Sequence, residues 1–224
     1  MGIIIKLENV KKFYKQSRAL NGVSLTMDEG EEYLIRGASG SGKSTLLYLL
    51  GGLDRPSEGR VIVNQKNLAE LSDEELAVYR NRYVGFVFQF HFLLPSMNCL
   101  DNLLLPARLA GFSTKVTQDV KSRVLALSET LNVSHCLTKF PFELSGGEQQ
   151  RINIIRALSL KPKLLLCDEP TGNLDSENSQ KVIQLLRSLA REFKATLVVV
   201  THDPLIAESF SNQLLMRDGI LVTN

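Results

Sequence analysis

The sequence predicts an α/β protein with a mostly parallel sheet that helices cover on both faces. Three observations lead to this fold class: apolar strands alternate with segments of helical spacing, several strands are apolar at nearly every position, and a glycine-rich loop joins one strand directly to a helix. Continuously apolar strands are typical of parallel sheets buried on both faces. The 224 residues suit one domain. We therefore expect residues 1–224 to form a single domain, with a helical lobe inserted at about 90–160.

The first third of the chain is predicted to consist mainly of strands. Apolar or alternating segments predict strands at 3–7, 23–27, 33–35 and 61–63, with a turn at 28–30. The strand at 33–35 runs into the glycine-rich loop, and an apolar helical segment follows at 46–50. This part of the chain therefore contains a strand–loop–helix unit.

The remaining two thirds alternate between strands and helices. After a buried strand at 84–88, helical spacing predicts helices at 101–109, 115–131 and 145–158. Ser145 is expected to cap the last of these, because Glu148 follows three residues later and completes a capping box. Beyond this helical lobe we expect strands at 163–167, 196–200 and 213–216, with a helix at 176–192.

The composition is that of an ordinary folded protein, with 44% hydrophobic and 22% charged residues. It excludes wholesale disorder, and no apolar run approaches the roughly 18 residues of a membrane-spanning helix. A net charge of +2 argues against a dedicated nucleic-acid binder, so we expect no nucleic-acid partner. The N-terminus lacks the features of a signal peptide, which favours a cytoplasmic protein.

Three cysteines, Cys99, Cys136 and Cys167, are spread along the chain. No pair has the spacing of metal ligands, and an odd number does not suit a disulfide framework. We interpret all three as reduced, structural residues. His91 and His135 match no chemical motif and are interpreted as structural residues.

Residues 37–45 match the phosphate-binding pattern G-x-x-x-x-G-K-[ST]. Glycines let backbone amides curl around a polyphosphate, and the helix that follows directs its positive dipole end at the anion. Lys43 is expected to contact the β- and γ-phosphates and Ser44 to ligate Mg²⁺. A chance match arises in about 1% of chains of this length. The predicted nucleotide-binding residues here are Gly37, Ser39, Gly40, Ser41, Gly42, Lys43, Ser44 and Thr45.

Two carboxylates, Asp168 and Glu169, follow the apolar strand at 163–167. In an α/β sheet, the carboxyl ends of the strands hold the ligand-binding side chains. Asp168 is expected to reach the Mg²⁺ shell, and Glu169 to act as general base towards an attacking water. The alternative is a strand that ends in two solvated acids.

Ser145, Gly146 and Gly147 stand at the predicted start of a helix and form a second candidate anion site. An ordinary capped helix start is the alternative interpretation. One ATP does not need two such sites from one chain. The second site is therefore best explained if it closes over an ATP held by another copy.

The segment 144–149, Leu-Ser-Gly-Gly-Glu-Gln, resembles the signature of the ATP-binding-cassette ATPases. Its position between the phosphate loop and the Asp168-Glu169 pair also fits that family. The resemblance implies a phosphate-loop NTPase core with an N-terminal antiparallel β part and an inserted helical lobe. It further implies hydrolysis of ATP with Mg²⁺, by a head-to-tail homodimer that forms on ATP binding.

The same resemblance implies roles for four further residues. Gln89 resembles the glutamine that contacts Mg²⁺ and water, and His202 resembles the switch histidine that contacts the γ-phosphate. Both would join Glu169 in catalysis. Asp175 resembles the acid of a loop that crosses the dimer seam, and Tyr14 resembles the aromatic residue that stacks on adenine. For Tyr14 a plain surface tyrosine is the alternative.

Several segments, among them Gln-Phe-His-Phe-Leu-Leu-Pro at 89–95, resemble a bacterial group of cassettes that serve lipoprotein release, macrolide export or cell division. The short chain and this segment favour the lipoprotein-releasing members, with the other two as alternatives. The resemblance implies a peripheral protein on the cytoplasmic face of the inner membrane, bound to integral membrane permease subunits and not touching the cargo. The apolar residues after Gln89 are expected either to dock a permease helix or to belong to the lobe core.

Overall fold

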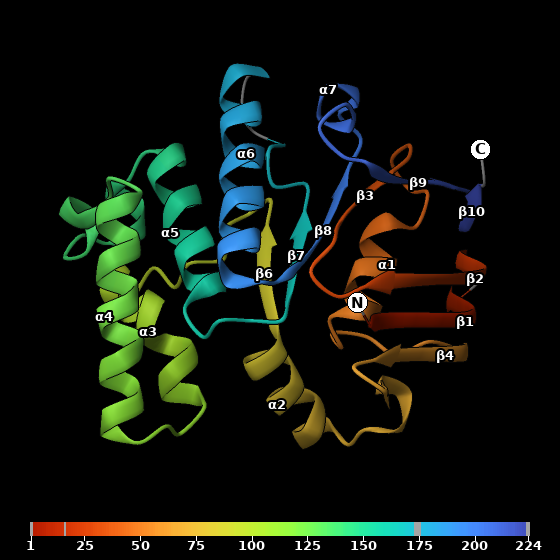
Figure 1. The fold of residues 1–224 in the computed structure, drawn as a ribbon, viewed down its shortest axis with the longest axis horizontal. Coiled ribbons are helices and arrows are strands. Elements are labelled where there is room, and N and C mark those ends of the chain that lie inside the picture. Colours follow the sequence, from red (N-terminus) through yellow and green to blue (C-terminus); the bar gives the residue numbers. More distant parts are fainter. Residues whose placement is uncertain (1, 16, 173–175, 223–224) are drawn as a thin grey trace.

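A computed structural model describes residues 2–15, 17–172 and 176–222, which form two sheets and a group of helices (Figure 1). The first sheet is antiparallel along its described strands, in the order β2-β1-β4-β5. Its strands are β1 (Ile3–Tyr14), β2 (Ser17–Asp28), β4 (Glu58–Val63) and β5 (Lys66–Asn67). This sheet is the N-terminal antiparallel part that the sequence resemblance implies.

The second sheet is mostly parallel and has the order β10-β9-β3-β8-β7-β6. β3 pairs in parallel with both β8 and β9, and β7 pairs in parallel with β8 and β6. Only β10 runs antiparallel to its neighbour within the described strands. The bounds are β3 (Glu32–Arg36), β6 (Val84–Phe88), β7 (Leu164–Asp168), β8 (Thr196–Thr201), β9 (Asn212–Arg217) and β10 (Ile220–Val222).

The parallel sheet is buried on both faces, as its continuously apolar strands predict. In β7, Leu165 and Cys167 pack into one hydrophobic cluster with the helices α3, α4, α5 and α6. Leu164 and Leu166, whose side chains point the other way, pack into a second cluster with α1, α2 and the antiparallel sheet. The predicted fold class is therefore confirmed.

The helices lie at several places around the sheets, with α6 beside the middle strands of the parallel sheet (Figure 1). α3, α4 and α5 gather beyond β6, while α1 lies on the side of the antiparallel sheet. The helix bounds are α1 (Lys43–Leu50), α2 (Asp73–Tyr83), α3 (Cys99–Leu109), α4 (Thr114–Thr130), α5 (Gly146–Leu158), α6 (Ser176–Phe193) and α7 (Pro204–Ala207), with 3₁₀ turns at Leu68–Glu70, Ser134–Cys136 and Pro141–Glu143. No helix in the described ranges is both long and apolar enough to cross a bilayer.

The sequence did not predict α2, although the other long helices match their predicted ranges to within a few residues. α2 buries only Leu76 and Tyr79, so it lacks a clear apolar stripe. A capping box marks its start, because the Ser72 hydroxyl accepts from the Glu75 amide and the Glu75 carboxylate accepts from the Ser72 amide. β1 also extends to Tyr14, well beyond the predicted strand at 3–7.

The register of the parallel sheet determines which side chains meet. Asp168 at the end of β7 is level with Phe88 in β6 and with Val200 in β8. Arg36 at the end of β3 is level with Thr201. Because parallel strands end at the same edge, the segments that follow Arg36, Phe88, Asp168 and Thr201 lie together.

Candidate functional site

The glycine-rich loop connects β3 to α1 at the carboxyl edge of the sheet. Gly42 caps α1 in the left-handed region, with φ of 102°. A Cβ atom at this position would also overlap the Ala19 carbonyl oxygen of β2. Backbone conformation and close packing therefore both require glycine where the loop enters the helix.

The Lys43 side chain folds back over this loop. Its ammonium donates hydrogen bonds to the carbonyl oxygens of Gly37 (2.8 Å) and Ala38 (3.0 Å). Lys43 is only 6% exposed, and so is Ser41, whose buried hydroxyl has no hydrogen-bond partner within the described residues. The loop thus holds a cation and an unpaired hydroxyl at the N-terminal end of α1, where the helix dipole favours an anion.

Ser44, in the first turn of α1, faces the end of β7. Its hydroxyl donates to Asp168 Oδ1 at 2.9 Å, and Asp168 is buried. Tyr48, one turn further along α1, has its pKa raised to about 12 by burial and by the charge of Asp168. A hydroxyl and a carboxylate side by side are hard oxygen ligands of the kind that Mg²⁺ prefers.

Glu169 is held in a left-handed backbone conformation, with φ of 46°, directly after the strand. One oxygen of its carboxylate accepts from the Thr201 hydroxyl at 2.9 Å, and the other lies 2.8 Å from His202 Nδ1. The backbone amide of Glu169 donates to the carbonyl oxygen of Val200. Non-glycine residues rarely adopt the left-handed backbone conformation. Those that do are found often at functional sites, where neighbouring contacts hold them in place.

The structure thus pairs residues that were singled out one by one from separate motifs, Ser44 with Asp168 and Glu169 with His202. Thr201 was not singled out in the sequence, although it ends β8 directly before His202 and fixes the Glu169 carboxylate. Its position at the carboxyl end of a parallel strand was an available signal.

Gln89 follows β6 and packs against the segment after Glu169. A Cβ atom at Gly172 would come within 2.5 Å of Gln89 Nε2, so the two residues are in direct contact. Gln89 therefore lies beside the segment that carries Asp168 and Glu169. Asp175, three residues beyond Gly172, lies outside the described residues.

Ser145 caps α5 as predicted, through a complete capping box with Glu148. The Ser145 amide and hydroxyl donate to the same Glu148 oxygen, at 2.8 Å and 2.6 Å. Ser145 and Gly146 are exposed. α5 packs in the cluster on one face of the sheet and α1 in the cluster on the other. The strands β6, β7 and β8 lie between α5 and α1 in Figure 1, so this protomer does not bring its two candidate anion sites together.

Tyr14 ends β1 in a small polar network next to α1. Its hydroxyl donates to Asp54 Oδ2 at 2.5 Å, and the Lys12 ammonium lies 4.9 Å from the centroid of its ring. Burial and Asp54 raise the pKa of Tyr14 to about 12, while the Thr45 hydroxyl acts in the opposite direction. The ring is partly exposed beside the phosphate loop helix, a position that fits both interpretations given above.

The chain is similar to known proteins over nearly its whole length. The chain is 44% identical to a lipoprotein-releasing system ATP-binding protein LolD from Aquifex aeolicus, over 99% of this chain and 97% of that protein. A protein of the same name from Bdellovibrio bacteriovorus is 46% identical over 94% of this chain and 96% of its own length.

Solved structures agree with these relatives. A dimeric ATP-binding cassette in a post-hydrolysis state with ADP and Pi has a TM-score of 0.87 and 38% identity, and covers 98% of this chain and 97% of its own. A second dimeric structure, of a bacterial ABC transporter cassette, gives a TM-score of 0.88 with the same identity and coverage. The model of the ABC transporter family matches residues 20–172. The phosphate loop, the signature helix start and the acidic strand end all fall within this range, and the chain belongs to the ABC transporter family.

Proposed function

We propose that the chain is the ATP-hydrolysing subunit of an ABC transporter that releases lipoproteins from the inner membrane. The ATPase part rests on one juxtaposition, in which the loop residue Ser44 meets Asp168 and the adjacent Glu169 meets His202. Lipoprotein release is supported by the names of relatives that are 44% and 46% identical over nearly the full chain. The proposed unit is one domain spanning residues 1–224, with a helical lobe at about 90–160 that includes α3, α4 and α5.

In this proposal the glycine-rich loop binds the triphosphate. The amides of residues 37–45 and the positive end of α1 surround the phosphates, and Lys43 turns from the Gly37 and Ala38 carbonyls to the β- and γ-phosphates. The exchange is favourable because an ammonium gains more from a phosphate oxygen than from a neutral carbonyl. Tyr14 would stack on the adenine.

The donor set at the end of β7 fits Mg²⁺. Ser44 and Asp168 already face each other, and Gln89 lies beside the following segment, so these three residues would hold the ion. Mg²⁺ held by these residues would supply positive charge against the charge that develops on the phosphates during transfer. The protein's part is to keep the hydroxyl, the carboxylate and the amide oriented at one sheet edge.

Glu169 is proposed to accept the proton of the attacking water. Thr201 fixes one carboxylate oxygen and leaves the other directed at His202. His202 is largely exposed, so its ring is free to meet the γ-phosphate when a nucleotide is present. The pair would thus orient the water between a base and the phosphate that it attacks.

A second copy of the chain is proposed to complete each site. Ser145, Gly146 and Gly147 are solvent-accessible at the start of α5 and lie on a different side of the sheet from the protomer's own phosphate loop. The two solved cassettes described above are dimeric. We propose a head-to-tail homodimer that forms on ATP binding, with the signature of one copy on the γ-phosphate held by the other and Asp175 at the seam.

The partner in the membrane is proposed to bind a cleft beside Gln89. This cleft has a volume of about 630 Å³ and lies between α2, β6 and the end of α3. Phe92 is 63% exposed and contacts two residues that line the cleft: its ring centroid is 5.2 Å from that of Phe88, and its carbonyl accepts from Arg156. A concave apolar surface next to exposed aromatic residues suits a helix of an integral membrane permease. The chain would thus act as a peripheral subunit at the cytoplasmic face, without touching the cargo or nucleic acid.

Replacing Phe92 with aspartate is expected to abolish recruitment to permease-containing membranes while nucleotide affinity stays unchanged. Aspartate tolerates the left-handed backbone at this position, where φ is 48°, so the change removes the apolar side chain without added strain. Ile3, 56% exposed on β1, provides the control Ile3→Asp. Co-sedimentation with the membranes measures recruitment, and undiminished sedimentation of Phe92→Asp would argue against this docking surface.

Lipoprotein release itself is expected to depend on ATP turnover by this chain. Proteoliposomes that contain the co-purified membrane subunits and a triacylated lipoprotein should release that lipoprotein to a soluble acceptor when the chain and ATP are added. The variant Glu169→Gln should release none. Intact ATP turnover without any release would leave the ATPase proposal standing and contradict the lipoprotein assignment.

A further inference from the structure

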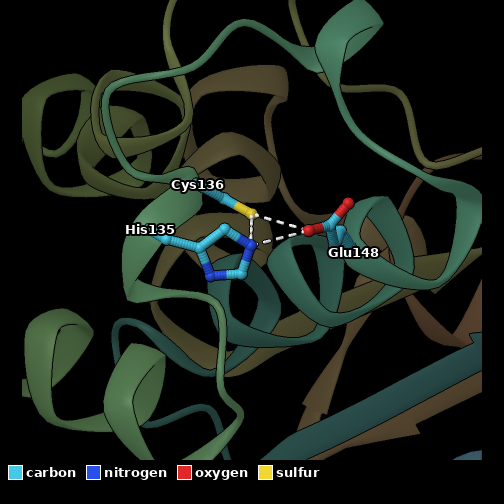
Figure 2. A group of neighbouring side chains, drawn as sticks. All are labelled: His135, Cys136 and Glu148. Carbon is cyan, nitrogen blue, oxygen red and sulfur yellow. Dashed lines mark hydrogen bonds and ion pairs between the residues drawn. The ribbon is translucent and has the colours of Figure 1, made fainter.

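Three potential metal ligands from two elements meet at the start of α5, outside the nucleotide site (Figure 2). His135 and Cys136 belong to the 3₁₀ turn Ser134–Cys136, and Glu148 lies in the first turn of α5. His135 Nε2 is 2.8 Å from Glu148 Oε1, and Cys136 Sγ is 3.4 Å from each of these two atoms. One nitrogen, one sulfur and one oxygen therefore point at a common centre (Figure 2).

We propose that His135, Cys136 and Glu148 form a Zn²⁺ site whose occupancy acts on the helix start at Ser145. Zn²⁺ binds thiolate, imidazole and carboxylate at about 2.3, 2.0–2.1 and 2.0–2.2 Å in tetrahedral geometry. Such bonds separate the ligand atoms by roughly 3.4–3.6 Å. The two sulfur distances already match, and only the His135–Glu148 hydrogen bond must open, by roughly half an ångström. Mg²⁺ and Ca²⁺ do not suit this set, because they prefer oxygen ligands alone.

The three side chains differ in exposure, so a metal ion can enter only from the side of His135. The His135 side chain is 58% exposed, while Glu148 is mostly covered and Cys136 is fully buried. An ion would reach the thiol past the exposed imidazole and would keep a water molecule as its fourth ligand on the solvent side. Two ligands on one short turn and one on a capped helix need little rearrangement to bind together.

Binding exchanges a proton for the metal. Burial, together with Glu148, raises the pKa of Cys136 to about 11. At neutral pH the thiol is therefore protonated, and its S–H group donates a hydrogen bond to Glu148 Oε1. On binding, the sulfur–metal bond replaces the S–H bond, and the proton leaves to solvent.

The two oxygens of Glu148 connect the site to the signature segment. Oε1 faces His135 and Cys136, whereas Oε2 accepts from the amide and the hydroxyl of Ser145. An ion on Oε1 withdraws charge from the carboxylate and weakens Oε2 as the acceptor for Ser145. This consequence rests on the proposed function, in which Ser145 contacts the ATP of the other copy; the metal site does not.

Co²⁺ substitution tests the site on the full chain without nucleotide. A tetrahedral Co²⁺ site with one thiolate should show a sulfur-to-metal charge-transfer band in the near ultraviolet, and Zn²⁺ should displace it. Cys136→Ser should lose the band. His135→Gln, at an exposed position that does not threaten folding, should weaken Co²⁺ binding by at least about tenfold, since even loss of a residue that only supports a ligand costs about 10- to 100-fold.

Cys99→Ala is the matched control, because Cys99 is a second buried thiol whose pKa is raised by burial and then by nearby carboxylates that include Glu148. It should keep the band. A wild-type chain without the band, or a band that survives Cys136→Ser and disappears in Cys99→Ala, would overturn the site.

ATP turnover tests the coupling separately. With Mg²⁺-ATP in excess, added Zn²⁺ should lower turnover of the wild-type chain and leave His135→Gln unaffected. Equal inhibition of both chains would overturn the coupling. Lack of turnover in both chains without Zn²⁺ would count against the proposed ATPase function and leave the Co²⁺ result intact.

Discussion

Glu169→Gln is expected to reduce ATP turnover by about 10²–10⁴-fold, the usual contribution of a general base. Glutamine keeps the size of the side chain and still accepts a hydrogen bond from the Thr201 hydroxyl, which holds Glu169 at 2.9 Å. It cannot take a proton from water at neutral pH. Nucleotide binding should therefore survive while hydrolysis nearly stops, and the ATP-bound dimer should accumulate.

Phosphate release measures the turnover, and size-exclusion chromatography with ATP measures the dimer. Glu129→Gln, an exposed position on α4, makes the same chemical change away from the site and should behave as wild type. A Glu169→Gln variant that stays monomeric at every ATP concentration would contradict the proposed dimer. Unchanged turnover would remove Glu169 from catalysis.

Lys43→Ala is expected to weaken ATP binding by about 10- to 150-fold. A hydrogen bond to a charged group contributes about 1.5–3 kcal/mol, and each 1.4 kcal/mol corresponds to a factor of ten in affinity. The Lys43 ammonium lies over the loop on the carbonyls of Gly37 and Ala38, and no other lysine is buried among the described residues. Alanine leaves the loop without its cation.

Titration with a fluorescent ATP analogue measures this loss. Lys66→Ala on β5 removes an exposed lysine and is the control for the change in net charge. A parallel urea unfolding curve separates lost binding from lost folding. Undiminished affinity in a folded Lys43→Ala variant would show that this lysine does not bind the phosphates.

Local signals in the sequence were sufficient for most of the fold. Continuous apolar strands predict the buried parallel sheet, and the pair Ser145 and Glu148 predicts the start of α5, because cap and partner are only three residues apart. α2 was missed because its buried residues Leu76 and Tyr79 leave no amphipathic pattern. The pair Ser72 and Glu75 was an available signal for its start, of the same kind as Ser145 and Glu148.

The candidate site was predictable where a motif or a strand end carries the residue. Lys43, Ser44, Asp168 and His202 belong to this class. Contacts between distant segments were not predictable in the same way. The spacing of His135 and Cys136 from Glu148 in the sequence gives no metal-ligand motif, and only the packing of the 3₁₀ turn on α5 brings the three together. The same holds for the network of Tyr14, Lys12 and Asp54, which joins β1 to the segment after α1.

The most direct test of the proposed shared site is the structure of Glu169→Gln crystallised with ATP. Each triphosphate should lie between the phosphate loop around Lys43 of one copy and Ser145 and Gly147 of the other, with two nucleotides per dimer. A structure in which one protomer alone encloses its nucleotide, with Ser145 of every copy remote from ATP, would contradict it.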